Sequence, residues 1–153
     1  MGGHSFTFKQ FHIEQDRCAM KVGTDSIVLG SWTPVAGAKR ILDIGTGTGI
    51  LALMLAQRTS RDVQIDAVEL DKEAVKQAEE NVNASPWRER IRVIQHDART
   101  YQAPAYDLII SNPPYFEHGQ ILPDAARQLA RLTGELDHAT LLDSAARLLT
   151  PFG

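Results

Sequence analysis

Cysteine occurs only once in the 153 residues, so the chain can form no internal disulfide bond and no paired-cysteine zinc site. No run of about 18 apolar residues is present, which argues against a membrane-spanning helix. The first residues have neither the basic stretch nor the apolar stretch of a signal peptide. Positive charge is not in excess, because the formal net charge is −3, and this disfavours a protein that coats nucleic acid non-specifically. These absences predict a cytoplasmic protein with no metal and no membrane partner, and no feature calls for an obligate protein partner.

The chain does have the composition of one globular domain, with 43% apolar and 23% charged residues. Four short runs are rich in isoleucine, leucine and valine, and turn-forming residues follow most of them. This pattern is typical of strands that are buried on both faces of a parallel sheet. The predicted strands are residues 40–44, 63–70, 91–94 and 106–111.

Stretches with helical spacing lie between the first three of these runs. Residues 50–58 are almost wholly apolar, and residues 72–83 repeat apolar side chains on one face, beginning next to Asp71. Strands that alternate with helices at this spacing form βαβ units with right-handed crossovers. The sequence therefore predicts an α/β fold with a doubly wound, mostly parallel sheet.

The two ends of the chain do not follow this alternation. Residues 1–36 are predicted to form an N-terminal extension on the carboxyl edge of the sheet, with a strand around Phe8 and a helix that Thr24 or Asp25 caps. Residues 37–153 are predicted to form the ligand-binding domain. A helix at 139–149 and a turn toward another strand come last, so we expect a sheet that is incomplete after its fourth strand and the following helix.

A glycine-rich loop directly follows the first predicted strand and opens the next helix. Its sequence is Asp43-Ile44-Gly45-Thr46-Gly47-Thr48-Gly49. Glycines let a backbone approach a ligand closely, and the helix N-terminus behind them presents free N–H groups. Glu69 ends the second predicted strand, where a carboxylate can accept hydrogen bonds from both hydroxyls of a ribose.

Two cofactor classes compete for this loop. The dinucleotide fingerprint is G-x-G-x-x-G, which leaves room for a pyrophosphate. The spacing here is G-x-G-x-G, and it follows Asp43, which repels a pyrophosphate but suits a ligand with an ammonium or sulfonium group. The loop therefore favours S-adenosylmethionine, with S-adenosylhomocysteine as product, and an NAD-dependent oxidoreductase is the alternative from another class.

Polar residues also follow the third and fourth predicted strands. Asp97 can accept a hydrogen bond from the exocyclic amine of the cofactor's adenine. Asn112-Pro113-Pro114-Tyr115 combines an amide oxygen with two prolines, which lack N–H donors and leave a stiff row of carbonyl acceptors. Such acceptors suit a planar NH2 group, and Tyr115 can stack on the ring that carries it. These four residues are predicted to be catalytic, by holding an amine in line with the methyl group.

The combined motifs resemble the class I, seven-stranded S-adenosylmethionine-dependent methyltransferases that act on amino groups. Further segments resemble the bacterial tRNA1(Val) adenine N6-methyltransferases, which modify the adenine just 3′ of the anticodon, position 37. These segments are residues 6–11, 16–25, 29–32, 85–87 and 136–138. The resemblance implies a Rossmann-like class I methyltransferase fold, a tRNA substrate, and a target base extruded into the pocket. The family fold has three more strands, so a C-terminal part of the domain is expected to be missing.

The resemblance also implies roles for single residues. Glycines 45, 47 and 49 form the cofactor loop, Glu69 holds the ribose, Asp97 holds the adenine, and the segment 21–24 closes over the methionine part. The residues assigned to the cofactor site are Lys21, Val22, Gly23, Thr24, Asp43, Gly45, Gly47, Gly49, Glu69, Leu70, Asp97, Ala98 and Asn112.

Several alternatives stay open. A protein glutamine amide and guanine N2 of ribosomal RNA also present a planar NH2, and an inactive cofactor-binding fragment is a third possibility. Basic clusters at 88–92 and at Arg127 and Arg131 are equally consistent with phosphate contacts and with solvated faces. The acidic run 66–80, apart from Glu69, is predicted to be a solvated helix face.

Overall fold

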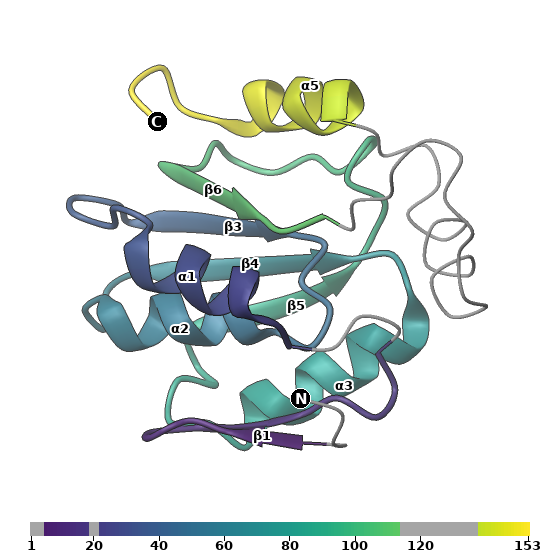
Figure 1. Ribbon diagram of the computed structural model, residues 1–153. Coiled ribbons are helices and arrows are strands. Elements are labelled where there is room, and N and C mark those ends of the chain that lie inside the picture. Colours follow the sequence, from purple (N-terminus) through teal and green to yellow (C-terminus); the bar gives the residue numbers. More distant parts are fainter. Residues whose placement is uncertain (1–4, 19–21, 114–137) are drawn as a thin grey trace.

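A computed structural model describes residues 5–18, 22–113 and 138–153 (Figure 1). Four parallel strands form one sheet in the order β5-β4-β3-β6. β3 (Arg40–Ile44) lies between β4 (Gln64–Glu69) and β6 (Leu108–Ser111), and β5 (Ile91–Gln95) flanks β4. The strand order thus reverses direction at β3, and open α/β sheets bind ligands beyond the carboxyl ends of their strands at such a point. The predicted parallel sheet is confirmed.

Helices cover both faces of this sheet. α1 (Thr24–Trp32) and α2 (Ile50–Arg58) lie side by side over one face (Figure 1), and α3 (Lys72–Asn83) packs against β4 and β5. α5 (His138–Leu148) packs on the other face. Because successive strand residues point to opposite faces, Ile41 joins the core under α2 while Leu42 joins the core that contains Leu148. The doubly wound arrangement is therefore confirmed.

The helix predictions hold closely, with one exception at a cap. The bounds of α2 and α3 are those predicted, and the Asp71 carboxylate caps α3 by accepting a hydrogen bond from the Glu73 N–H at 3.3 Å. The cap predicted for α1 is wrong, because Gly23, rather than Thr24 or Asp25, is its N-cap and no side chain bonds there. None of the helices in the described ranges is long and apolar enough to span a bilayer.

The N-terminal extension contains a hairpin rather than the single strand expected around Phe8. β1 (Ser5–Thr7) and β2 (His12–Glu14) are antiparallel, and the turn between them is closed by a bond from the Phe8 N–H to the Phe11 carbonyl at 2.8 Å. The hairpin runs alongside α3 (Figure 1). The extension also contacts the carboxyl edge of the sheet through α1, whose Ser26 bonds Asn112 after β6.

Candidate functional site

The four parallel strands end at the same edge of the sheet, and predicted site residues follow each of them. Beyond the ends of β3, β4 and β5 lies an open cleft. The residues that line the cleft are Ile44, Gly45, Val68, Glu69, Leu70, His96, Asp97, Ala98 and Arg99. Five of them belong to the predicted cofactor set, from three different strand ends.

The glycine loop needs its glycines for backbone conformation. Gly45, Gly47 and Gly49 have φ values of +72°, +55° and +88°, in the left-handed region that side chains disfavour. A Cβ atom added at Gly45 or Gly47 would meet nothing within 4 Å, so the surface of the loop is open to an approaching ligand. Gly49 also serves as the N-cap of α2.

Glu69 joins the glycine loop to the start of α3. One carboxylate oxygen accepts a hydrogen bond from the Gly47 N–H at 2.8 Å, and the other accepts from the Asp71 N–H at 3.0 Å. Burial raises the pKa of this carboxyl, although the two N–H donors act in the opposite direction. Each oxygen keeps a second lone pair, so the same carboxylate can hold the loop and accept ribose hydroxyls.

Asp43 is fully buried behind the loop. One of its carboxylate oxygens accepts the Thr46 hydroxyl at 2.7 Å, and the other, Oδ1, has no hydrogen-bond partner. Burial raises the pKa of Asp43 to about 7, and the negative charge of Glu69 raises it as well. A carboxylate in this position is costly to bury, and the positive charge of a cationic ligand at the loop lowers that cost. This chemistry fits the sulfonium-bearing cofactor that the sequence favours.

The raised pKa of Asp43 predicts a specific pH dependence of stability. Between its ordinary pKa of 3.8 and about 7, the unfolded chain loses the proton while the folded chain keeps it. The contribution of this group to the free energy of unfolding therefore falls as pH rises through that window and is constant above it. Asp43→Asn removes this term, so its stability relative to the parent should rise by about 1–4 kcal/mol between pH 4.5 and 8, measured by urea unfolding. A difference that does not change with pH contradicts the assignment.

Asp97 is held by its own turn. Its carboxylate accepts hydrogen bonds from the Arg99 backbone N–H at 2.9 Å and from the Arg99 guanidinium at 2.6–3.1 Å. This guanidinium lowers the pKa of Asp97, which keeps the carboxylate ionised. Arg99 also lines the cleft and was not among the predicted residues. The Asp-x-Arg spacing at a strand end is the signal that could have found it.

Asn112 is tied to the N-terminal extension. Its side-chain NH2 donates to the Ser26 hydroxyl oxygen of α1 at 2.9 Å, which leaves its oxygen as an acceptor. Sequence reasoning missed Ser26, because the contact joins residues 86 positions apart. Pro113 follows within the described range, whereas Pro114, Tyr115 and Lys21 lie outside it.

The rest of the predicted closing segment serves the start of α1. Val22 is buried in the core shared with α2, Gly23 is the N-cap and Thr24 is the first helical residue. The side chain of Val22 is therefore part of the core and does not face the cleft. Any contact of Val22 with the cofactor, as predicted for this segment, would have to come from its backbone.

Two of the three arginines in the basic cluster at 88–92 make contacts within the fold. The Arg90 guanidinium donates to the carbonyls of Ala56 at 2.5 Å and Val63 at 3.2 Å, at the end of α2. Arg92 pairs with Asp66 at 3.1–3.2 Å. These contacts favour a structural role over phosphate binding for both arginines, while Arg127 and Arg131 lie outside the described residues.

The same contacts correct the expectation for the acidic run 66–80. Asp66 is buried, and its carboxylate accepts the Tyr106 hydroxyl at 2.6 Å in addition to Arg92. It is therefore part of a buried polar cluster under the sheet rather than of a solvated face. No group of three potential metal ligands occurs in the part of the chain that the structure describes.

Comparison with known families decides where the chain belongs. The model of the methyltransferase small domain matches residues 18–137, which is most of the chain. The chain belongs to the methyltransferase small domain family. Two curated relatives are tRNA1(Val) (adenine(37)-N6)-methyltransferases, from Tolumonas auensis at 88% identity over 153 residues and from Aeromonas hydrophila at 62% over 154. The resemblance inferred from the motifs is thus confirmed.

This member of the methyltransferase small domain family spans 65% of the length of those two relatives, and both alignments cover 100% of it. A solved SAM-dependent methyltransferase from Thiobacillus denitrificans, in complex with S-adenosyl-L-homocysteine, has a TM-score of 0.61 at 19% identity. That match covers 90% of this chain and 48% of the other, and it supports the Rossmann-like fold alone.

Proposed function

We propose that this methyltransferase small domain transfers a methyl group from S-adenosylmethionine to the exocyclic N6 amine of an adenine in tRNA, at position 37 by similarity to its relatives. The observation that carries the proposal is the meeting, at one edge of the sheet, of three acidic strand ends and an amide. Asp43, Glu69 and Asp97 bring acceptors suited to a cationic nucleoside, and Asn112 brings an acceptor suited to an amine.

We infer a division of labour along the chain. Residues 37–153 hold the cofactor, and residues 1–36 form an extension that completes the site from the other side. The bond between Ser26 and Asn112 supports this division, since it joins the extension to the end of β6. We further propose a cytoplasmic protein that acts on a tRNA substrate, as the names of its relatives suggest.

Bound S-adenosylmethionine supplies a methyl group on a cationic sulfur, and transfer to nitrogen leaves the neutral thioether S-adenosylhomocysteine. The chain's own residues position the reactants. Glu69 orients the ribose and Asp97 the adenine, while Asn112 and the prolines after it accept hydrogen bonds from the target NH2. Those bonds draw the nitrogen lone pair out of conjugation with the ring and aim it at the methyl carbon, and the amine proton leaves to solvent. No nucleophilic side chain is required.

The direct test is mass spectrometry of nucleosides after the full-length protein is incubated with S-adenosylmethionine and unmodified tRNA. We expect N6-methyladenosine in tRNA and no product in parallel reactions with ribosomal RNA or a release-factor protein. Methylation of guanine N2 or of a glutamine side chain would instead support a related amino-methyltransferase. A thermal shift with NAD but not with S-adenosylmethionine would overturn the cofactor assignment.

A further inference from the structure

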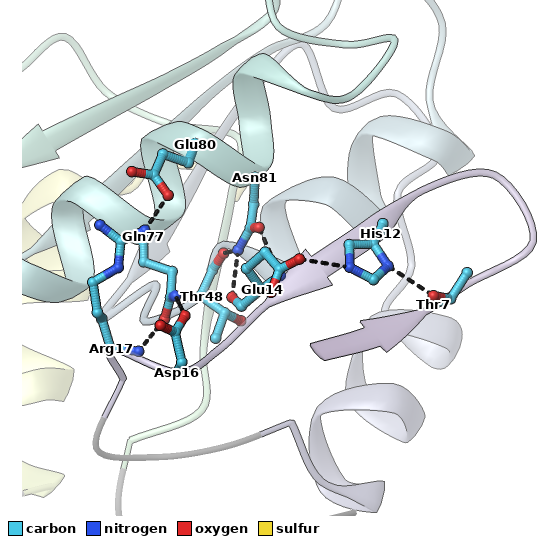
Figure 2. Close-up of polar contacts among 9 residues, drawn as sticks. All are labelled: Thr7, His12, Glu14, Asp16, Arg17, Thr48, Gln77, Glu80 and Asn81. Carbon is cyan, nitrogen blue, oxygen red and sulfur yellow. Dashed lines mark hydrogen bonds and ion pairs between the residues drawn. The ribbon is translucent and has the colours of Figure 1, made fainter. Parts of the chain in front are cut away.

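Two amide side chains on α3 are buried. Gln77 and Asn81 lie one helical turn apart on the same face, and their exposed fractions are 0% and 3%. Figure 2 shows the Asn81 side chain pointing at Glu14, at the end of β2, and the Gln77 side chain pointing at Asp16 and Arg17, which follow the hairpin. Buried amides are stable only when their polar atoms are bonded, so their partners define what the pair does.

Asn81 joins three parts of the chain. Its oxygen accepts from the Glu14 N–H, and its NH2 donates to the Glu14 carbonyl and to the Thr48 carbonyl, each at 2.8 Å. Thr48 lies between Gly47 and Gly49 in the glycine loop. One side chain on α3 therefore fixes the end of β2 and the loop in one geometry, as the dashed lines in Figure 2 indicate.

Gln77 extends this attachment along the next residues. Its oxygen accepts from the Arg17 N–H at 2.9 Å, and its NH2 donates to the Asp16 carboxylate at 2.5 Å. Between these contacts, the buried side chain of Gln15 accepts from the Val22 N–H at 2.8 Å. The segment docked on α3 thereby also fixes the residue that precedes the Gly23 cap of α1, the helix whose Ser26 contacts Asn112.

The hairpin depends on such external contacts. An isolated two-stranded hairpin is at best marginally stable in water, and each strand here has three residues. A second attachment is aromatic, since Phe11 packs edge-on against Trp87 with ring centroids 5.6 Å apart. Trp87 belongs to the 85–87 segment that marks the resemblance to the tRNA methyltransferases, and its structural contribution is to seat the hairpin beside α3.

We propose that Gln77 and Asn81 are positioning residues of the cofactor site, which hold the N-terminal segment and the glycine loop in fixed positions relative to each other. This inference rests on the proposed function, because it takes the cleft to bind S-adenosylmethionine. Loss of either amide leaves buried backbone groups without partners and lets the segment and the loop move independently. The cofactor then has to order both on binding, which weakens its affinity.

The test is calorimetric titration of S-adenosylhomocysteine into the full-length protein and its variants. We expect Asn81→Ala and Gln77→Ala to weaken binding by about 10- to 100-fold, the usual range for leaving a buried polar group unpaired. Glu79→Ala is the matched control, because Glu79 is an exposed residue between the two amides on the same helix. Its affinity should stay within about 2-fold of the parent. Amide hydrogen exchange at Glu14 and Arg17 should accelerate in the two amide variants and not in the control.

A further variant distinguishes a positioning role of the two amides from a general loss of stability. Tyr101→Phe removes a buried hydroxyl contact to Tyr106 on the opposite face of the sheet, so it should lower the melting temperature without changing affinity. Asn81→Ser keeps a smaller hydroxyl that can donate and accept, and it serves if Asn81→Ala does not fold. If the parent fails to bind S-adenosylhomocysteine, the proposed function fails. If the parent binds and the folded Gln77 and Asn81 variants bind equally well, only this inference fails.

Discussion

Asn112→Ala should reduce methyl transfer by about 100- to 1,000-fold, comparable to the loss of one preorganised polar contact at other reaction centres. In the proposed mechanism the amide oxygen of Asn112 accepts from the target amine, since its NH2 is engaged by Ser26 at 2.9 Å. Without that oxygen, the lone pair of the amine stays conjugated with its ring and is poorly aimed. The affinity for S-adenosylhomocysteine should remain within a few-fold of the parent, because the ribose and adenine contacts are unchanged. Single-turnover transfer to tRNA measures the first effect and calorimetry the second.

Asn83→Ala provides the control for this experiment, because Asn83 is an exposed residue of the same type at the end of α3. It should transfer methyl groups at the parent rate. Full activity in Asn112→Ala would end the amine-docking mechanism. An equal loss of cofactor affinity and transfer would instead assign Asn112 to cofactor binding alone.

Glu69→Gln should weaken the binding of S-adenosylhomocysteine by about 10- to 100-fold, as expected for the loss of charge-assisted hydrogen bonds. The substitution keeps the shape of the side chain and one acceptor oxygen. It removes the negative charge and replaces the other oxygen with an NH2 group. That group cannot accept the hydrogen bond from the Gly47 or Asp71 N–H, and it cannot accept one from a ribose hydroxyl. Both the glycine loop and the ribose contact are therefore expected to loosen.

Glu73→Gln is the matched control, since Glu73 is an exposed acid in the first turn of α3 that pairs with Lys76. Its calorimetric affinity should equal that of the parent. Glu69→Ala should bind still more weakly than Glu69→Gln, because both acceptors are lost. Unchanged affinity in both Glu69 variants rules out the ribose role.

The sheet could be predicted closely from sequence because its signal is local. The apolar run 40–44 gives β3 at the predicted bounds, and the neighbouring strands differ from prediction by one or two residues at their ends. The hairpin was less accessible, because strands of three residues carry little periodic signal. Its place beside α3 depends on bonds between residues 60 and 67 positions apart.

The polar residues show the same division. The proximity of the acids at strand ends could be predicted because a parallel sheet brings the ends of its strands together whatever their separation in sequence. Sequence alone could not predict the contacts of Gln77, Asn81 and Arg90, since a polar residue on an amphipathic helix or after one normally faces water. What buries them is a partner from elsewhere in the chain: the end of the hairpin for Asn81, the residues that follow the hairpin for Gln77, and the end of α2 for the arginine.

The position of β3 in the sheet also sets a condition on how the protein is made. Its partner on one side, β6, is encoded 67 residues downstream, so the central strand emerges from the ribosome long before that neighbour exists. At about 5–20 residues per second, the gap lasts roughly 3 to 13 s. Throughout that interval a row of backbone donors and acceptors in the middle of the future sheet is exposed to pairing with other nascent chains. Synthesis of the β6 segment is therefore what allows this side of β3 to be paired within its own chain.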